Sequence, residues 1–252
     1  MTDMKNNGVI LSDLSAASVP CVRVQVTINR NVELAKRKAK ATYTWTGQYL
    51  NGKPVFRVPA RRVISLKSAF AHKKLCDGPK FTLGFVCFFR CLFCYVYPML
   101  CRHPAIRRLL KETGLSFDQV GIEFEDPLPI LARELQNRRG QLKYNDPDDK
   151  HVIYASPLVD VAANVPTAET TVRSCRLILE KTHLVIRLLS KSAFLRKIAQ
   201  ELADYKEWLI YGLATGTLSD KLADSFELHT PRAICRSRST TRFSTMPGEV
   251  QT

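Results

Sequence analysis

Short apolar stretches alternate with amphipathic stretches over most of the chain. Five runs have the length and composition of buried strands: 81–86, 121–124, 151–155, 184–189 and 208–213. Five further segments carry apolar residues at helical spacing: 104–112, 128–138, 166–181, 193–202 and 219–226. Strands followed in turn by helices predict parallel pairing with right-handed crossovers. The pattern therefore predicts an α/β fold, either a barrel or part-barrel or an open doubly wound sheet.

The helix expected over 166–181 has one apolar stripe. Pro166 suits its first turn, and Val172, Cys175 and Leu179 follow at helical spacing. A cysteine on such a stripe behaves as a small hydrophobic residue. Cys175 is therefore predicted to belong to the core and not to a metal site.

The two ends of the chain lack this pattern. The N-terminal part is basic and has only a short alternating segment at 22–28, and the last residues are polar without any period. We divide the chain into a basic N-terminal extension at 1–74, an α/β unit at 75–232 and a disordered tail at 233–252.

The composition is that of a globular protein. With 252 residues and 45% hydrophobic content, the chain can bury the core of one or two domains. Its first residues open no apolar segment, so no secretory signal is expected. The most apolar stretch, 81–100, contains Arg90 and is interpreted as a strand plus a loop and not as a membrane span. Eight cysteines without a secretory signal predict a reducing compartment, the cytoplasm.

Positive charge is concentrated in the N-terminal third. The net charge is +15, and residues 1–80 hold 15 Lys and Arg against 4 Asp and Glu. Basic runs lie at 36–40 and 61–80, with four aromatic residues between them: Tyr43, Trp45, Tyr49 and Phe56. Basic residues interleaved with aromatic ones suit a nucleic-acid backbone and unstacked bases. The sequence thus predicts a nucleic-acid partner, DNA or RNA, with a solvated basic segment that binds nothing in particular as the alternative; the charge would also suit an acidic protein.

Three closely spaced cysteines are the strongest chemical signal in the chain. Cys87, Cys91 and Cys94 have the spacing C-x3-C-x2-C directly after the first predicted strand. The carboxyl ends of strands are where parallel α/β proteins carry their sites. Thiolates are the soft ligands that iron–sulfur clusters and zinc select. Because the three lie in one short loop, forming a metal site there loses little chain entropy.

The spacing leaves more than one kind of site open. Three cysteines can hold three irons of a four-iron cluster and leave the fourth iron to a small molecule, or Cys101 can complete a ferredoxin-type cluster. Zinc with Cys101 or His103 as fourth ligand is the second possibility, although structural zinc sites favour paired C-x2-C spacings. The third is a cysteine-rich apolar strand without a metal.

The cysteine motif followed by Tyr95 resembles that of radical S-adenosylmethionine (radical SAM) enzymes. Further segments resemble the spore photoproduct lyase-like, or DNA repair photolyase-like, branch of that superfamily: 75–82, 93–96, 101–106, 155–160, 189–193 and 212–218. The resemblance extends from about residue 55 to about residue 234.

The resemblance implies a fold and a chemistry. The fold would be a partial parallel (βα)6 barrel, and Cys87, Cys91 and Cys94 would bind three irons of a [4Fe-4S] cluster. The amino and carboxylate groups of S-adenosylmethionine would chelate the open iron. An external electron donor of the flavodoxin or ferredoxin type would supply the electron that cleaves this cofactor to a 5′-deoxyadenosyl radical. In the lyase that names the branch, the substrate is a thymine dimer of spore DNA.

Three further side chains are implicated by the resemblance. Tyr95 matches a tyrosine beside cofactor and substrate. Lys191 matches a lysine that would meet the cofactor carboxylate, a charge-assisted contact; its alternative is an ordinary surface lysine at a strand end. Asp160 matches an acidic residue of the third βα loop, with a loop carboxylate that binds no ligand as its alternative.

The chain also departs from the family pattern. The cysteine that returns a hydrogen atom to the product radical in the lyase falls at about Pro157 here, Phe93 replaces a tyrosine, and Gly212 replaces a serine expected at the cofactor. A sixth strand should follow residue 232, where the polar tail begins, so we expect a barrel truncated to about five βα units. The alternatives to an active enzyme are a nucleic-acid-binding protein with a structural metal and an inactive remnant.

Overall fold

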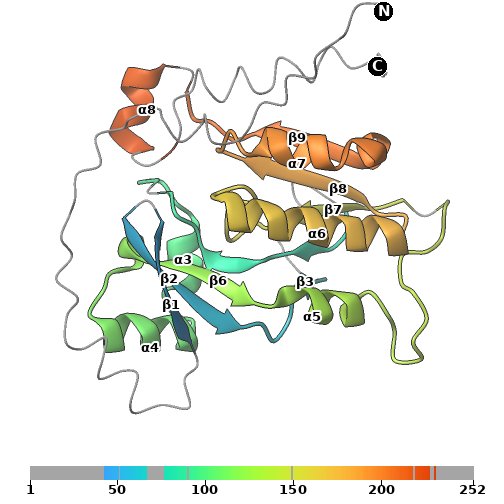
Figure 1. Ribbon diagram of the computed structural model, residues 1–252, viewed down its shortest axis with the longest axis horizontal. Helices are drawn as coiled ribbons and strands as arrows, with labels where there is room; N and C mark the ends of the chain where they lie inside the picture. The colour runs from blue at the N-terminus through green and yellow to red at the C-terminus, as the bar shows by residue number, and fades with distance from the viewer. Residues whose placement is uncertain are drawn as a thin grey trace, which may run out of the picture.

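The computed structural model describes residues 43–50, 52–66, 77–89, 91–148, 150–217, 219–227 and 230 (Figure 1). Several sequence predictions lie outside the described residues: the strand at 22–28, the basic run at 36–40, the basic residues Lys67, Lys73 and Lys74, and the tail at 233–252.

The elements follow the predicted alternation. The strands are β1 Thr44–Leu50, β2 Lys53–Pro59, β3 Ile64–Ser65, β4 Lys80–Phe81, β5 Gly84–Val86, β6 Gly121–Glu125, β7 Val152–Ala155, β8 Val185–Ser190 and β9 Leu209–Leu213. The α-helices are α3 Val96–Leu100, α4 Pro104–Thr113, α5 Pro127–Glu134, α6 Val165–Lys181, α7 Leu195–Glu201 and α8 Asp220–Phe226, and the 3-10 helices are η2 Phe117–Gln119 and η3 Ala203–Trp208. From residue 104 onward every predicted helix and strand is present.

Helix α5 ends four residues before the predicted end at 138. The Asn137 side chain accepts hydrogen bonds from the backbone N–H groups of Arg139 and Gln141 and so closes a turn. Gly140 within this turn has a φ of 76°, which favours glycine. An asparagine that bonds its own backbone competes with the helix, and the apolar spacing alone does not report this.

The described strands form two sheets. One has the order β1–β2–β6–β5 and the other the order β3–β4–β7–β8–β9. The pairs β7–β8 and β8–β9 are parallel, as the alternation of strands and helices predicts. The pairs β2–β6 and β4–β7, which the alternation does not predict, are parallel as well. The predicted order differs at its start, because β5 pairs antiparallel with β6 and β6 lies in a different sheet from β7. Neither sheet closes on itself within the described residues, so the implied barrel is not confirmed.

The chain crosses from one sheet to the other just before the cysteines. β4 ends at Phe81 in one sheet, and β5 begins at Gly84 in the other. Leu83 is hydrogen-bonded toward both: its N–H donates to Ser156 Oγ (3.2 Å), just after β7, and its carbonyl accepts from the N–H of Phe124 (2.9 Å) in β6. The single strand predicted here is therefore two short strands, because one continuous strand would pair within one sheet.

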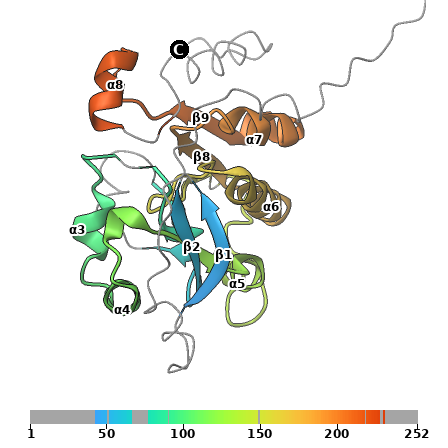
Figure 2. The same ribbon diagram turned by 60° about the vertical axis from the view of Figure 1, so that its left-hand side comes forward.

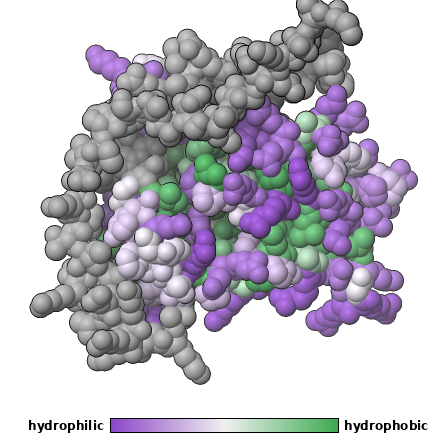
Figure 3. Space-filling view, in the orientation of Figure 1, coloured by the Kyte–Doolittle hydropathy of each residue, from purple (hydrophilic) through white to green (hydrophobic). Residues whose placement is uncertain are grey.

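Helices cover the strands from two sides. α5, α6 and α7 lie in a row along one side, and α3 and α4 lie on the other (Figure 2). In Figure 3 hydrophilic residues cover much of the face that carries α5 to α7, with smaller apolar patches between them. Helices that expose polar residues and bury an apolar stripe are expected over a sheet. No helix within the described residues is long and apolar enough to cross a bilayer.

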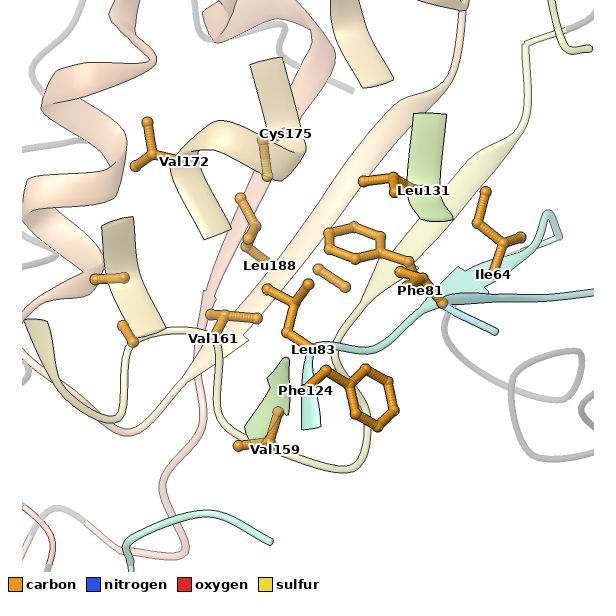
Figure 4. Packing of buried hydrophobic residues seen from close by; sticks show 14 of the residues in the cluster. Ile64, Phe81, Leu83, Phe124, Leu131, Val159, Val161, Val172, Cys175 and Leu188 are labelled. Carbon is orange, nitrogen blue, oxygen red and sulfur yellow. The ribbon is translucent and has the colours of Figure 1, made fainter. Parts of the chain in front are cut away.

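The apolar stripe of α6 enters the core as predicted. Cys175 is fully buried, and in Figure 4 its sulfur points toward Leu188 of β8. The same core contains Phe81 and Leu83 from the crossover and Leu131 from α5. The prediction that Cys175 is a core residue is confirmed. Asn164 starts α6, because its Oδ1 accepts a hydrogen bond from the backbone N–H of Thr167 (2.9 Å).

The described part of the N-terminal segment is paired with the rest of the molecule. β2 pairs with β6, and β3 pairs with β4. Two of the four aromatic residues expected to stack on bases belong to the core: Tyr43 and Phe56 are buried and pack edge to face at a centroid distance of 5.7 Å. Tyr49 is 41% exposed. The division of the chain at residue 74 stays a prediction.

Gly84 lies where β5 approaches β6 too closely for a side chain. A Cβ at position 84 would lie 2.4 Å from the carbonyl oxygen of Ile122, whereas one at Gly212 would meet a terminal methyl group of Leu189 at 2.1 Å. A leucine methyl group can move aside more easily than backbone can. We expect Gly84→Ala to destabilise the fold by about 1–3 kcal/mol and Gly212→Ala by clearly less, measured by urea unfolding. Equal losses in the two variants would contradict this packing.

Candidate metal and cofactor site

The three motif cysteines lie in the loop that joins β5 to α3. Cys87 directly follows β5, and Cys94 lies two residues before α3. A backbone hydrogen bond from the N–H of Cys94 to the carbonyl of Cys91 (3.1 Å) tightens the loop between them. Phe88 anchors it, because its ring is fully buried against Gly121, where a Cβ would lie 2.0 Å from a ring carbon. We call residues 87–95 the cysteine loop.

All three motif cysteines are free thiols, each only partly exposed. Burial above all, together with the neighbouring charges of Asp160 and of the other two motif cysteines, raises the pKa of Cys87 to about 12. Burial likewise raises the pKa of Cys91 to about 11, although the positive charge of Lys191 acts in the opposite direction. These mutual effects mean that the three sulfurs lie near one another. Without a metal the thiols of Cys87 and Cys91 keep their protons at neutral pH, and a bound metal would displace them.

The donor set fits an iron–sulfur cluster by its chemistry. Three thiols on one loop are the soft ligands that such a cluster takes. Their arrangement is not preassembled, since no group of three or more Cys, His, Asp or Glu side chains in the described ranges is placed to hold a metal ion. The other two candidate ligands have their own contacts: Cys101 Sγ lies 3.5 Å from the carbonyl oxygen of Pro98, and the His103 ring packs on Phe85 at 4.8 Å.

Tyr95 connects the cysteine loop to the loop after β7. Its hydroxyl donates a hydrogen bond to the carbonyl of Pro157. Burial of the hydroxyl raises the pKa of Tyr95, and the nearby Tyr154 and thiols add to this effect. Tyr95 is thus brought to the position at which the family resemblance expects a hydrogen-donating cysteine.

Asp160 is bonded by donors from its own loop and from the end of β8. Its carboxylate accepts hydrogen bonds from Ser190 Oγ (2.6 Å), the N–H of Lys191 (2.8 Å) and the N–H of Ala162 (2.9 Å). Burial raises the pKa of Asp160, and these hydrogen bonds act against that rise. Asp160 therefore fixes the β7–α6 loop to the end of β8 and so orients Lys191. A contact of Asp160 with a cofactor stays a prediction.

Lys191 reaches from the end of β8 to the cysteine loop. Its Nζ lies 5.0 Å from the centre of the Phe93 ring, and it donates to the carbonyl of Ala214 (3.3 Å) and to Glu227 Oε1 (2.5 Å). The Lys191 side chain is 15% exposed and that of Glu227 is fully buried. The structure thus brings Lys191 beside the cysteines, but the lysine is bonded to a carboxylate of the protein itself.

Glu227 is a site residue that sequence reasoning missed. It lies one residue beyond the helix predicted over 219–226, and a glutamate there is expected to face solvent. In the structure it forms an isolated antiparallel bridge with Cys91, and the N–H of Leu92 donates to the carbonyl of Phe226 (2.9 Å). Figures 1 and 2 show α8 standing above the start of α3 and the loop before it. Residues 226–227 therefore latch the end of α8 onto the cysteine loop.

The cysteine loop and α3 expose several large apolar side chains. Five neighbouring large side chains are between 41% and 68% exposed: Leu92, Phe93, Tyr95, Tyr97 and Met99. Scattered exposed apolar residues are normal, but a contiguous group is typical of a binding surface.

One solved structure to which the chain is similar is that of spore photoproduct lyase complexed with dinucleoside spore photoproduct. The TM-score is 0.52 and the sequence identity is 12% over 75% of this chain and 47% of that one. The chain thus spans about half the length of the lyase, and at this identity the similarity shows a shared fold alone. No family model and no curated protein sequence matches the chain.

Proposed function

We propose that the chain is a radical SAM enzyme. The observation that carries this proposal is the cysteine loop itself: three free thiols with the spacing C-x3-C-x2-C follow a strand in a fold similar to that of spore photoproduct lyase. Lys191, which the resemblance implicates from a distant part of the chain, lies against Phe93 of the same loop. Tyr95 of the loop itself bonds the carbonyl of Pro157 in the loop after β7. These contacts support the assignment.

Each candidate residue would have its own role in such a site. Cys87, Cys91 and Cys94 would hold a [4Fe-4S] cluster, which supplies the electron that cleaves S-adenosylmethionine to a 5′-deoxyadenosyl radical. Lys191 would bind the cofactor carboxylate, and its ammonium group would release Glu227 to do so. Tyr95 would line the space between the cysteine loop and the β7–α6 loop. An electron donor of the flavodoxin or ferredoxin type completes the proposal.

DNA is the substrate class that we propose. The structural neighbour carries a dinucleoside photoproduct, and the chain has a net charge of +15 with most of the excess in its first third. Positive charge raises the rate of encounter with a polyanion and its affinity. Repair by the lyase's own reaction is not part of the proposal, because Pro157 stands where that reaction uses a cysteine.

Electron paramagnetic resonance tests the function. The protein is reconstituted with iron and sulfide without oxygen, reduced with dithionite, and measured with and without S-adenosylmethionine. We expect a cluster signal that changes when the cofactor is added, together with release of 5′-deoxyadenosine. A cluster signal that the cofactor leaves unchanged, with no 5′-deoxyadenosine, would contradict the proposal.

A second candidate is a DNA-binding protein without catalysis. The bond between Lys191 and Glu227 favours it, because the lysine assigned to the cofactor is already paired within the protein. In that case, a variant with all three motif cysteines changed to alanine would keep its full DNA affinity and its fold.

A further inference from the structure

Lys53, the first residue of β2, is a buried lysine. Only 4% of its surface is exposed, and it lies beside an apolar cluster of Val55, Phe88, Phe89 and Ala163. A buried ammonium group is unfavourable unless polar groups compensate it. The Lys53 Nζ donates a hydrogen bond to the carbonyl oxygen of Phe89 at 3.2 Å. The lysine thus reaches 36 residues along the chain to the cysteine loop.

The Phe89 carbonyl is also the neighbour of a motif cysteine. Cys87 Sγ lies 3.9 Å from the same oxygen that accepts from Lys53. Cys87 and Cys91, on either side of Phe89, both pack against the apolar cluster. The Lys53 amino group and the first motif sulfur therefore lie on the same carbonyl oxygen, in apolar surroundings that screen charge poorly.

We propose that Lys53 is a positioning residue for the cluster of the proposed function, on which this inference rests. It has two effects: its hydrogen bond fixes the backbone between Cys87 and Cys91, and its charge offsets the negative charge that three thiolates bring into an apolar region. Interactions between charges are strong where water is excluded. Net charge and hydrogen bonding near an iron–sulfur cluster set its reduction potential. Lys53 should therefore make the cluster easier to reduce.

This role gives one basic residue of the N-terminal segment a place in the site. Lys53 follows the tight turn between β1 and β2, in which Gly52 has a φ of 74°. Its neighbour Arg57 lies on the same strand but is exposed. The two residues carry the same charge in opposite environments, which makes Arg57 a matched control.

The test compares the reduction potential of the reconstituted cluster in the wild type and in Lys53→Gln, Lys53→Met, Lys53→Arg and Arg57→Gln. Glutamine keeps a donor for the Phe89 carbonyl and removes the charge. We expect Lys53→Gln to lower the equilibrium constant for reduction about tenfold, which is 59 mV for a one-electron couple. Lys53→Arg should stay near the wild type, and Arg57→Gln should not shift. A lower iron content in Lys53→Met that Lys53→Arg restores would support the positioning effect.

Unchanged iron content and an unchanged reduction potential in Lys53→Gln and Lys53→Met would overturn this inference but not the proposed function, because the cluster would still be present. Wild-type protein without iron would overturn the proposed function and this inference with it. If both neutral variants lose their cluster and their native circular dichroism, the Lys53→Arg variant decides whether the position needs the charge or the shape of lysine. Recovery in the arginine variant supports a need for the charge, and failure there too overturns it, because the position would then require lysine for packing.

Discussion

Replacement of Cys87, Cys91 and Cys94 by alanine is expected to abolish iron binding. The wild-type protein, reconstituted without oxygen, should carry about four irons and four sulfides per chain, as a [4Fe-4S] cluster requires, and the triple variant close to none. All three sulfurs come from one loop of nine residues, so no ligand outside the loop replaces them without rearrangement of the chain. Iron and sulfide analysis with the visible absorption spectrum measures this. The fold should survive, because none of the three cysteines is fully buried.

The matched control is Cys101→Ser. Cys101 is also a partly exposed free cysteine, only seven residues from Cys94, but it lies outside the motif. We expect the iron content of this variant to equal that of the wild type and its response to S-adenosylmethionine to persist. Loss of iron from Cys101→Ser would mean that the protein supplies a fourth ligand, which leaves no open iron for the cofactor. One zinc and no iron in the wild type would contradict the cluster outright.

The second large effect is expected from Lys191→Met. The Glu227 carboxylate would then stay fully buried without the ammonium group that lies 2.5 Å from it. Loss of one partner from a buried ion pair destabilises proteins by about 3–5 kcal/mol. Urea unfolding of the metal-free protein should show a loss of this size. The double variant Lys191→Met with Glu227→Leu should recover much of it, because an apolar pair of similar volume replaces a buried ion pair at little cost.

An exposed ion pair provides the comparison. Lys197 and Glu201 lie 3.7 Å apart on α7, with side chains 26% and 40% exposed. Glu201→Gln should change the free energy of unfolding by about 0–1 kcal/mol, as for surface pairs in general. If Lys191→Met lowered the free energy of unfolding no more than Glu201→Gln does, the buried ion pair of Lys191 and Glu227 would contribute nothing to the folded state.

Local patterns predicted the elements well. Helix α4 begins at Pro104 and is followed by Gly114, as the residue preferences at helix ends predict. The apolar stripe that contains Cys175 faces the core. These signals act within a few residues, where backbone preference and side-chain spacing decide the outcome. The parallel pairing of β7, β8 and β9 also followed, because each is connected to the next through a helix.

Pairings between distant segments could not be predicted. Nothing in the sequence near Leu83 indicates that the strand changes sheets there, since the choice depends on where β6 and β7 lie. Lys53 and Glu227 were missed for a related reason: a charged residue is expected at the surface, and each becomes part of the site only because a remote backbone approaches it. The motif cysteines were predicted from sequence because their residue type and spacing carry the chemical signal themselves, whereas Lys191 was predicted only from the family resemblance.

The double attachment of Leu83 has a mechanical consequence. One residue ties the two sheets together four residues ahead of the first motif sulfur. A change in the angle between the sheets would strain these two hydrogen bonds, and through the three residues of β5 it would displace Cys87. The position of Cys87 is therefore expected to depend on the relative tilt of the two sheets.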